Sequence, residues 1–171
     1  MTTKLSPAVL GLALAACASG SASSHDDQLD QAAGTWAKDK AGCATYHYVR
    51  STFSWTGTTT QTDVEITNDR ATRRRYVAHV VQDGGQVKTE QWDETGPAVG
   101  SHAGAFEAKT VEQLLADCRQ TLAQDPETND ITLVIGTHGV PTACVFVPKN
   151  CADDCTMGVA LADFACGPLS P

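Results

Sequence analysis

The chain has 171 residues, with 12 basic and 20 acidic side chains and a formal net charge of −8. This acidic balance argues against nucleic acid and against anionic lipid headgroups as partners. The length is sufficient for one domain with a hydrophobic core.

The N-terminal segment has the pattern of a bacterial lipoprotein signal peptide. Lys4 precedes an apolar stretch from about Pro7 to Ala16, which is too short to span a bilayer, since a spanning helix needs about 20 residues. The stretch ends in Leu14-Ala15-Ala16-Cys17, which resembles a lipobox. The resemblance implies that residues 1–16 are removed and that Cys17 carries the lipid, and Ala18 after it implies the outer membrane. An ordinary secretory signal whose cleavage site happens to precede a cysteine is the alternative.

Removal of residues 1–16 would leave 171 − 16 = 155 residues and, because Lys4 is lost, 11 basic against 20 acidic side chains, a net charge of −9. Small residues dominate the segment after Cys17. We expect residues 17–25 to form a flexible tether and residues 26–171 to form a single domain anchored to the membrane through the lipid.

Two segments show the periodicity of amphipathic helices. The first runs from about Asp26 to Ala41, with capping-box spacing between Ser24 and Asp27. The second runs from Thr110 to about Gln124, and Thr110 begins its own capping box. Apolar residues recur at helical spacing in both, at Leu29, Ala32, Ala33 and Trp36 in the first and at Val111, Leu114, Leu115, Cys118 and Leu122 in the second.

The remaining segments alternate in the manner of strands. Residues 44–92 predict an antiparallel meander of three or four strands, with turns at Asn68-Asp69 and Asp83-Gly84-Gly85. A long loop follows from Glu94 to Ala108. After the second helix we expect strands at Ile131–Ile135, Pro141–Val147 and Val159–Cys166.

The order of elements predicts an α+β fold. Each helix has one apolar stripe and each strand set has one apolar face, so the economical arrangement has two layers. We expect a twisted antiparallel sheet of about six or seven strands, with both helices packed on one face. The other face is partly polar and is left for solvent or for a partner.

Six cysteines remain after Cys17: Cys43, Cys118, Cys144, Cys151, Cys155 and Cys166. An even number in an exported domain predicts disulfide bonds. Cys118 lies on the apolar stripe of a helix, and we expect it to pair with Cys144 in a strand beneath it. Zinc held by Cys151 and Cys155 is the competing interpretation.

The arrangement resembles an uncharacterised family of short bacterial envelope domains that are common in lipoproteins. The matching pieces are Trp36, Tyr46-x-Tyr48, Trp92, Glu94-x-Gly96, Val99-Gly100-Ser101-His102, Thr110-Val111-x-x-Leu114 and Gly139-Val140-Pro141-Thr142. The resemblance extends from about Leu29 to Phe164 and implies a fold and a location. It brings no activity, and the extra cysteines Cys43, Cys151, Cys155 and Cys166 depart from it.

Few side chains are candidates for catalysis. Ser101 and His102 are adjacent in a glycine-containing loop and, with an acid such as Asp93, could form a hydrolase site. The alternative is that both side chains fix the path of the loop by hydrogen bonds. Glu90, Asp93 and Glu94 flank the loop, and we expect them to be solvated. Trp92 beside them is either a core residue or a recognition contact.

Other polar residues could bind metals. His47, His79 and His138 could bind zinc or copper if their strands were neighbours, and Asp153 and Asp154 could bind calcium. Simpler interpretations place these residues in strands and turns. Arg73-Arg74-Arg75 is a local exception to the acidic balance, and it is either an exposed strand with salt-bridged arginines, which is favoured, or a patch for phosphate or nucleic acid.

The sequence therefore predicts an outer-membrane lipoprotein, facing the periplasm or the cell surface, that binds an envelope protein without catalysis, a cofactor or a metal. We expect it to be monomeric, with a contact surface at Trp92, Glu94, Ser101 and His102 or on the open sheet face. A small periplasmic hydrolase and a metal-binding envelope protein are the alternatives.

Overall fold

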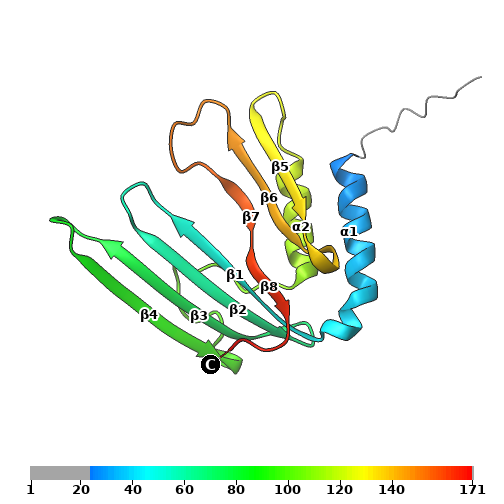
Figure 1. The fold of residues 1–171 in the computed structure, drawn as a ribbon, viewed down its shortest axis with the longest axis horizontal. Coiled ribbons are helices and arrows are strands. Elements are labelled where there is room, and N and C mark those ends of the chain that lie inside the picture. Colours follow the sequence, from blue (N-terminus) through cyan, green and yellow to red (C-terminus); the bar gives the residue numbers. More distant parts are fainter. Residues whose placement is uncertain (1–23, 171) are drawn as a thin grey trace, which may run out of the picture.

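The computed structural model describes residues 24–170, which form two α-helices and eight strands in two antiparallel sheets (Figure 1). The predicted α+β class is confirmed. The expected signal peptide, Cys17 and residues 18–23 of the expected tether lie outside the described residues. No helix among residues 24–170 has the length and apolar character needed to cross a membrane.

Helix α1 (His25–Asp39) begins at the predicted capping box. The Asp27 backbone N–H donates to Ser24 Oγ over 3.1 Å, and the Ser24 N–H donates to the Asp27 carboxylate over 3.2 Å. Ser24 and His25, which were assigned to the tether, are therefore the cap and the first residue of the helix. Leu29, Ala32 and Trp36 are buried along one face. A short 3₁₀-helix, η1 (Lys40–Cys43), continues α1.

Five strands form the first sheet, in the order β4-β3-β2-β1-β8. The first four strands along the chain are joined as successive hairpins, and the last strand of the chain returns to lie beside β1 (Figure 1). The bounds are β1 (Thr45–Phe53), β2 (Thr59–Thr67), β3 (Arg70–Val81), β4 (Val87–Thr95) and β8 (Ala162–Cys166). The predicted turn at Asn68-Asp69 is present, and both residues have positive φ.

Three strands form the second sheet, in the order β5-β6-β7. Helix α2 (Val111–Leu122) precedes it and packs on β6 and β7. The remaining elements are η2 (Gly96–Ala98), β5 (Asn129–Ile135), η3 (Thr137–Gly139), β6 (Pro141–Pro148) and β7 (Met157–Ala160).

The division into two sheets differs from the single sheet of six or seven strands that the sequence predicts. The segment expected to be one strand from Val159 to Cys166 is two strands, β7 and β8, which are separated at Leu161 and belong to different sheets. The alternation of side chains specifies which face of a strand is buried, but it does not specify the neighbouring strand.

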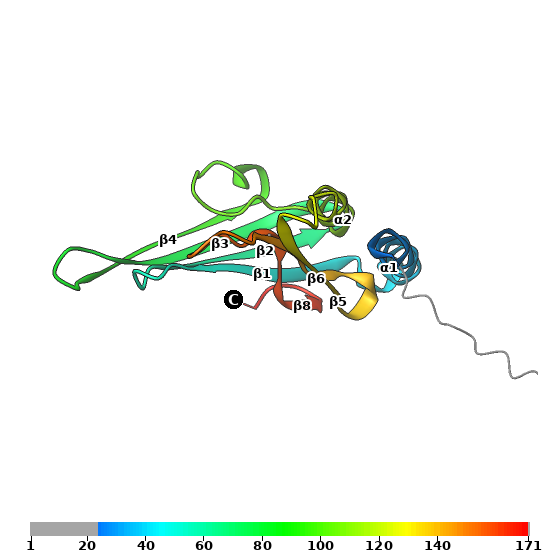
Figure 2. The same ribbon diagram turned by 90° about the horizontal axis from the view of Figure 1, so that it is seen from above.

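The hydrophobic core is shared by both helices and both sheets. Its buried members include Trp36 of α1, Tyr46 and Tyr48 of β1, Leu114 of α2 and Val140 before β6. The Trp36 and Tyr46 rings meet edge to face, with their centroids 5.2 Å apart. Figure 2 shows α2 and the segment after β4 on the same side of the first sheet. Helix α1 packs beside α2 and against η3 at the end of this sheet.

The six described cysteines form three pairs at disulfide distance. The predicted Cys118–Cys144 pair is confirmed, with the two Cα atoms 5.5 Å apart. Cys43 pairs with Cys166 and so links η1 to the end of β8. Cys151 pairs with Cys155, and this pairing takes up the two thiols that the zinc hypothesis requires.

Candidate functional site

The candidate site is built on two rows of side chains that cross the first sheet on the face covered by α2. Tyr48, Val64, Arg74 and Glu94 are register partners on successive strands, and all four are buried. The next row consists of Arg50, Thr62, Tyr76 and Trp92. The loop between β4 and α2 lies over this face of the sheet (Figure 2).

Arg74 and Glu94 form a buried ion pair. Arg74 Nε donates to Glu94 Oε2 over 2.9 Å and Nη2 donates to Oε1 over 3.1 Å, and the side chains are 5% and 1% exposed. The pair is bidentate, the geometry in which arginine binds a carboxylate most strongly. Arg74 was expected in an exposed strand with its two neighbours; Arg73 and Arg75 do form salt bridges, with Asp93 and Asp63, but Arg74 points to the covered face.

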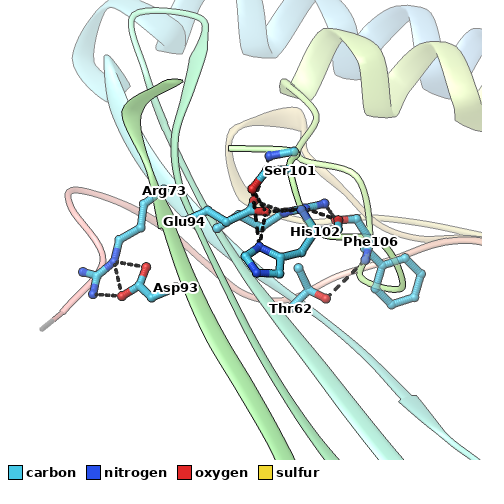
Figure 3. Close-up of polar contacts among 9 residues, drawn as sticks. Thr62, Arg73, Asp93, Glu94, Ser101, His102 and Phe106 are labelled. Atoms are coloured by element: carbon cyan, nitrogen blue, oxygen red, sulfur yellow. Dashed lines mark hydrogen bonds and ion pairs between the residues drawn. The ribbon is translucent and has the colours of Figure 1, made fainter. Parts of the chain in front are cut away.

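Glu94 also holds the loop after β4 (Figure 3). Its carboxylate accepts hydrogen bonds from the backbone N–H groups of Gly100 (2.7 Å) and His102 (2.6 Å). Ser101 Oγ donates over 3.0 Å and His102 Nδ1 over 2.9 Å. Burial alone would raise the pKa of Glu94, but the bonds from Arg74, Gly100 and His102 outweigh it and lower the pKa far below its usual range. Glu94 was expected to be solvated, and this is wrong.

The Arg74 guanidinium continues the same network along the loop. It donates to the carbonyl oxygens of His102 (2.7 Å) and Phe106 (3.3 Å). The Phe106 N–H in turn donates to Thr62 Oγ1 on β2 over 3.3 Å (Figure 3). Backbone groups that would otherwise be unpaired in a long loop are thereby satisfied, so the loop is fixed at both Glu94 and Phe106.

The arrangement of Ser101 and His102 differs from that of a catalytic serine and its base. Ser101 Oγ lies 3.4 Å from His102 Nδ1, and the same nitrogen faces Glu94 Oε1. In a hydrolase the carboxylate binds one ring nitrogen and the nucleophile binds the other. Asp93, the acid proposed with them, points to the opposite side and binds Arg73 (Figure 3). The two side chains fix the path of the loop, although they do so through Glu94 and not through the backbone.

Trp92 is the middle ring of a stack. Its centroid lies 5.2 Å from that of Tyr76 and 4.7 Å from that of His102, with nearly parallel planes in both cases. The Arg74 guanidinium lies 4.9 Å from the Trp92 ring. Trp92 is half-buried and His102 is exposed, so Trp92 is neither a deep core residue nor a free contact. The exposed edge of this stack is the surface that remains for recognition.

The metal-site candidates are separated in the structure. His47 contacts the carbonyl of Gly167, His79 contacts Thr89, and His138 contacts Asp39. Residues 24–170 contain no group of three or more His, Cys, Asp or Glu side chains placed to hold a metal ion. Asp154 accepts a hydrogen bond from the Trp55 N–H over 3.1 Å. Glu90 forms an exposed ion pair with Lys88.

A cleft of about 540 Å³ lies beside the same loop, between the end of β1 and strand β7. Arg50 and Phe106 line it, and the Arg50 guanidinium carbon lies 3.8 Å from the centre of the Phe106 ring. Our sequence analysis missed both residues. One signal was available, because Arg50 shares the parity of the buried Tyr46 and Tyr48 along β1.

Comparison of the chain with protein-family models, with curated proteins and with solved structures gave no match in any of the three. The resemblance to a family of envelope domains therefore stays a prediction.

Proposed function

We propose that the protein is a lipid-anchored envelope domain, carried by the outer membrane, that binds a protein partner without catalysing a reaction. The observation that carries the binding role is the saturation of Glu94. Its carboxylate, a candidate acid or base, is engaged by Arg74 and by the loop that contains Ser101 and His102. The hydrogen-bonding capacity of this carboxylate is used to hold a loop in one conformation, and preorganised loops favour binding.

The surface that this loop presents suits recognition. His102 is exposed over the ring of Trp92, and the neighbouring Ala103 and Gly104 are exposed at the loop tip. Aromatic rings beside a fixed loop are typical of contact sites, since they offer large area at a low cost in conformational entropy. On the opposite face, Arg73 pairs with Asp93 and Arg75 pairs with Asp63, so the charges within each pair cancel.

The proposed location is supported by the lipobox Leu14-Ala15-Ala16-Cys17 and by the cysteine pairs. All six cysteines among residues 24–170 are in pairs. Disulfides persist in oxidising compartments and are rare in the cytosol, so these pairs favour an exported domain.

The anchor is tested by intact mass measurement of the protein purified from its membranes. We expect a chain that begins at Cys17 and carries acyl chains, and a Cys17→Ser variant that lacks them. An unmodified chain that still begins at Met1 would contradict the anchor.

The binding role is tested by photo-crosslinking in intact cells. A photoreactive amino acid at Ala103 reports on the loop, and the same amino acid at Ala123, exposed at the end of α2, is the matched control. We expect one dominant protein adduct from position 103 and none at that mass from position 123. Identical patterns from the two positions, or no adduct at all, would count against the loop as a contact surface.

A further inference from the structure

Arg50 is set apart from the arginines nearby by its surroundings. Arg73, Arg74 and Arg75 each lie within 3.1 Å of a carboxylate oxygen. The described residues supply no such partner to Arg50, whose Nη2 donates to the carbonyl oxygen of Gly158 over 2.8 Å. Its Nε is buried and has no hydrogen-bond partner within residues 24–170, which is also true of Arg75 Nε.

This guanidinium is partly withdrawn from water. Burial is the largest influence on the pKa of the Arg50 guanidinium, and it lowers that pKa. Arginine nevertheless stays protonated in proteins. Asp117 offsets this cost through space, but no carboxylate within residues 24–170 contacts the guanidinium, so binding of a carboxylate from the cleft is favoured.

Two strand edges are open along the same cleft. Strand β1 pairs with β8 through residues 46–49, so in the described structure residues 50–53 have a strand neighbour, β2, on one side alone. Strand β7 pairs with β6 and has no second neighbour in the described sheet. Residues of both strands line the cleft. An open edge presents unpaired backbone N–H and C=O groups, which are the template for an added strand.

Large apolar side chains surround the cleft. Phe53 is 70% exposed and Met157 is 44% exposed, and both line it. Trp55, in the adjoining turn, is 74% exposed, and its backbone N–H binds Asp154. Exposed side chains of this size, gathered at one concave site, mark a binding surface. Asp154 is the one acidic residue among those that line the cleft.

We propose that this cleft binds an extended peptide segment of a partner protein that carries a carboxylate group. Arg50 binds the carboxylate, the free edge of β1 pairs with the peptide backbone, and Phe53 and Met157 contact the flanking apolar side chains. Phe106 forms one wall, and the network of Glu94 and Arg74 keeps it in place. The inference rests on the proposed binding role and does not depend on the lipid anchor.

A small amphiphilic carboxylate is the closest competitor. It would satisfy Arg50 and contact Phe53 and Met157, but it has no backbone to pair with β1 or β7. The strand edges therefore favour a peptide, and the experiment below separates the two ligands.

The test selects peptides from a random phage-displayed library on the purified protein. We expect the selected peptides to share an Asp or Glu between alternating apolar residues. Calorimetry with one synthetic selected peptide should show affinity reduced by about tenfold or more in Arg50→Gln, since truncating one partner of a desolvated charge pair has this scale of effect. Arg70→Gln, an exposed arginine on β3, is the matched control and should bind as the wild type does. Amide exchange should slow at residues 50–53.

A second variant and a second ligand keep the test decisive. Phe53→Glu changes an exposed side chain, so it should fold normally and still lose the peptide. Absence of an acidic consensus, or equal affinity of Arg50→Gln and wild type, would overturn the proposal. Binding of sodium octanoate with no enriched peptide would overturn the peptide and leave a small ligand. If Arg50→Gln leaves the crosslink from Ala103 unchanged in cells, the binding role stands and the cleft is not its site.

Discussion

Replacement of Glu94 by Gln tests whether the buried ion pair with Arg74 holds the loop. The amide keeps the shape of the side chain but leaves a buried guanidinium without its counter-charge. Breaking a buried pair in this way costs about 3–5 kcal/mol in the free energy of unfolding. For a domain of this size the midpoint of thermal unfolding falls by about 2–4 °C for each kcal/mol, hence by roughly 6–20 °C.

The matched control is Asp93→Asn, which breaks the neighbouring pair with Arg73. That pair is close, at 2.6 Å, but its side chains are 25% and 40% exposed, so the expected loss is about 0–1 kcal/mol. The assay is urea unfolding at pH 7 with the disulfides intact. The two variants are compared by their free energies of unfolding, provided that the m-value, the slope of that free energy against urea concentration, is the same as in the wild type. Equal losses in the Glu94 and Asp93 variants would refute the reasoning.

The pH dependence of this loss gives a second check. The pKa of Glu94 in the folded protein is depressed below its ordinary value of 4.5. A carboxyl group of this kind stabilises the fold fully above its unfolded pKa, and the contribution is lost as the pH falls through the folded pKa. The gap between wild type and Glu94→Gln should therefore be constant from pH 7 to about pH 5 and should shrink below pH 4.5. A gap that is unchanged at pH 3 would show that the charge of Glu94 is not its source.

Three further predictions concern the frame around the site. Burial raises the pKa of Tyr48 from 10.0 to about 12, so its stabilising effect should be complete below pH 10 and be lost as the pH rises from 10 to 12, and absorbance titration should show Tyr48→Phe with one fewer late-titrating phenol. Removal of the Cys43–Cys166 pair, which joins residues 123 positions apart, should cost about 4–5 kcal/mol by loop-closure entropy, measured by urea unfolding. Gly139→Ala would place a Cβ 2.1 Å from a backbone oxygen of α1, so it should lower the free energy of unfolding by about 2–5 kcal/mol in the same urea assay. The control Gly85→Ala meets no atom within 4 Å and should lower it by about 1 kcal/mol.

Local signals in the sequence carry much of the fold. Both capping boxes form where Ser24 and Thr110 predict them. The Cys118–Cys144 pair follows from placing one cysteine on a buried helical stripe and the other in a strand. These features depend on residues a few positions apart, whose periodicity fixes the buried face.

The division into two sheets depends on contacts that local patterns do not encode. Val159 to Cys166 is apolar enough for one strand, yet Leu161 marks the change from β7 to β8. The burial of Glu94 was not predicted for the same reason. The sequence alone suggests a solvated carboxylate, because it does not show that Arg74 lies opposite Glu94 on the neighbouring strand. One signal existed, because Arg74 shares the parity of Tyr76 and Ala78, which line the covered face.

The position of β8 links the order of synthesis to the completion of the sheet. Among the described strands, β8 follows all the others in the chain and is the outer neighbour of β1, since Cys166 is the register partner of Tyr46. Contacts between residues this far apart in sequence form late and slowly. A chain that lacks β8 would leave the outer edge of β1 unpaired along residues 46–49, so this sheet is completed by the strand that follows all the other described strands.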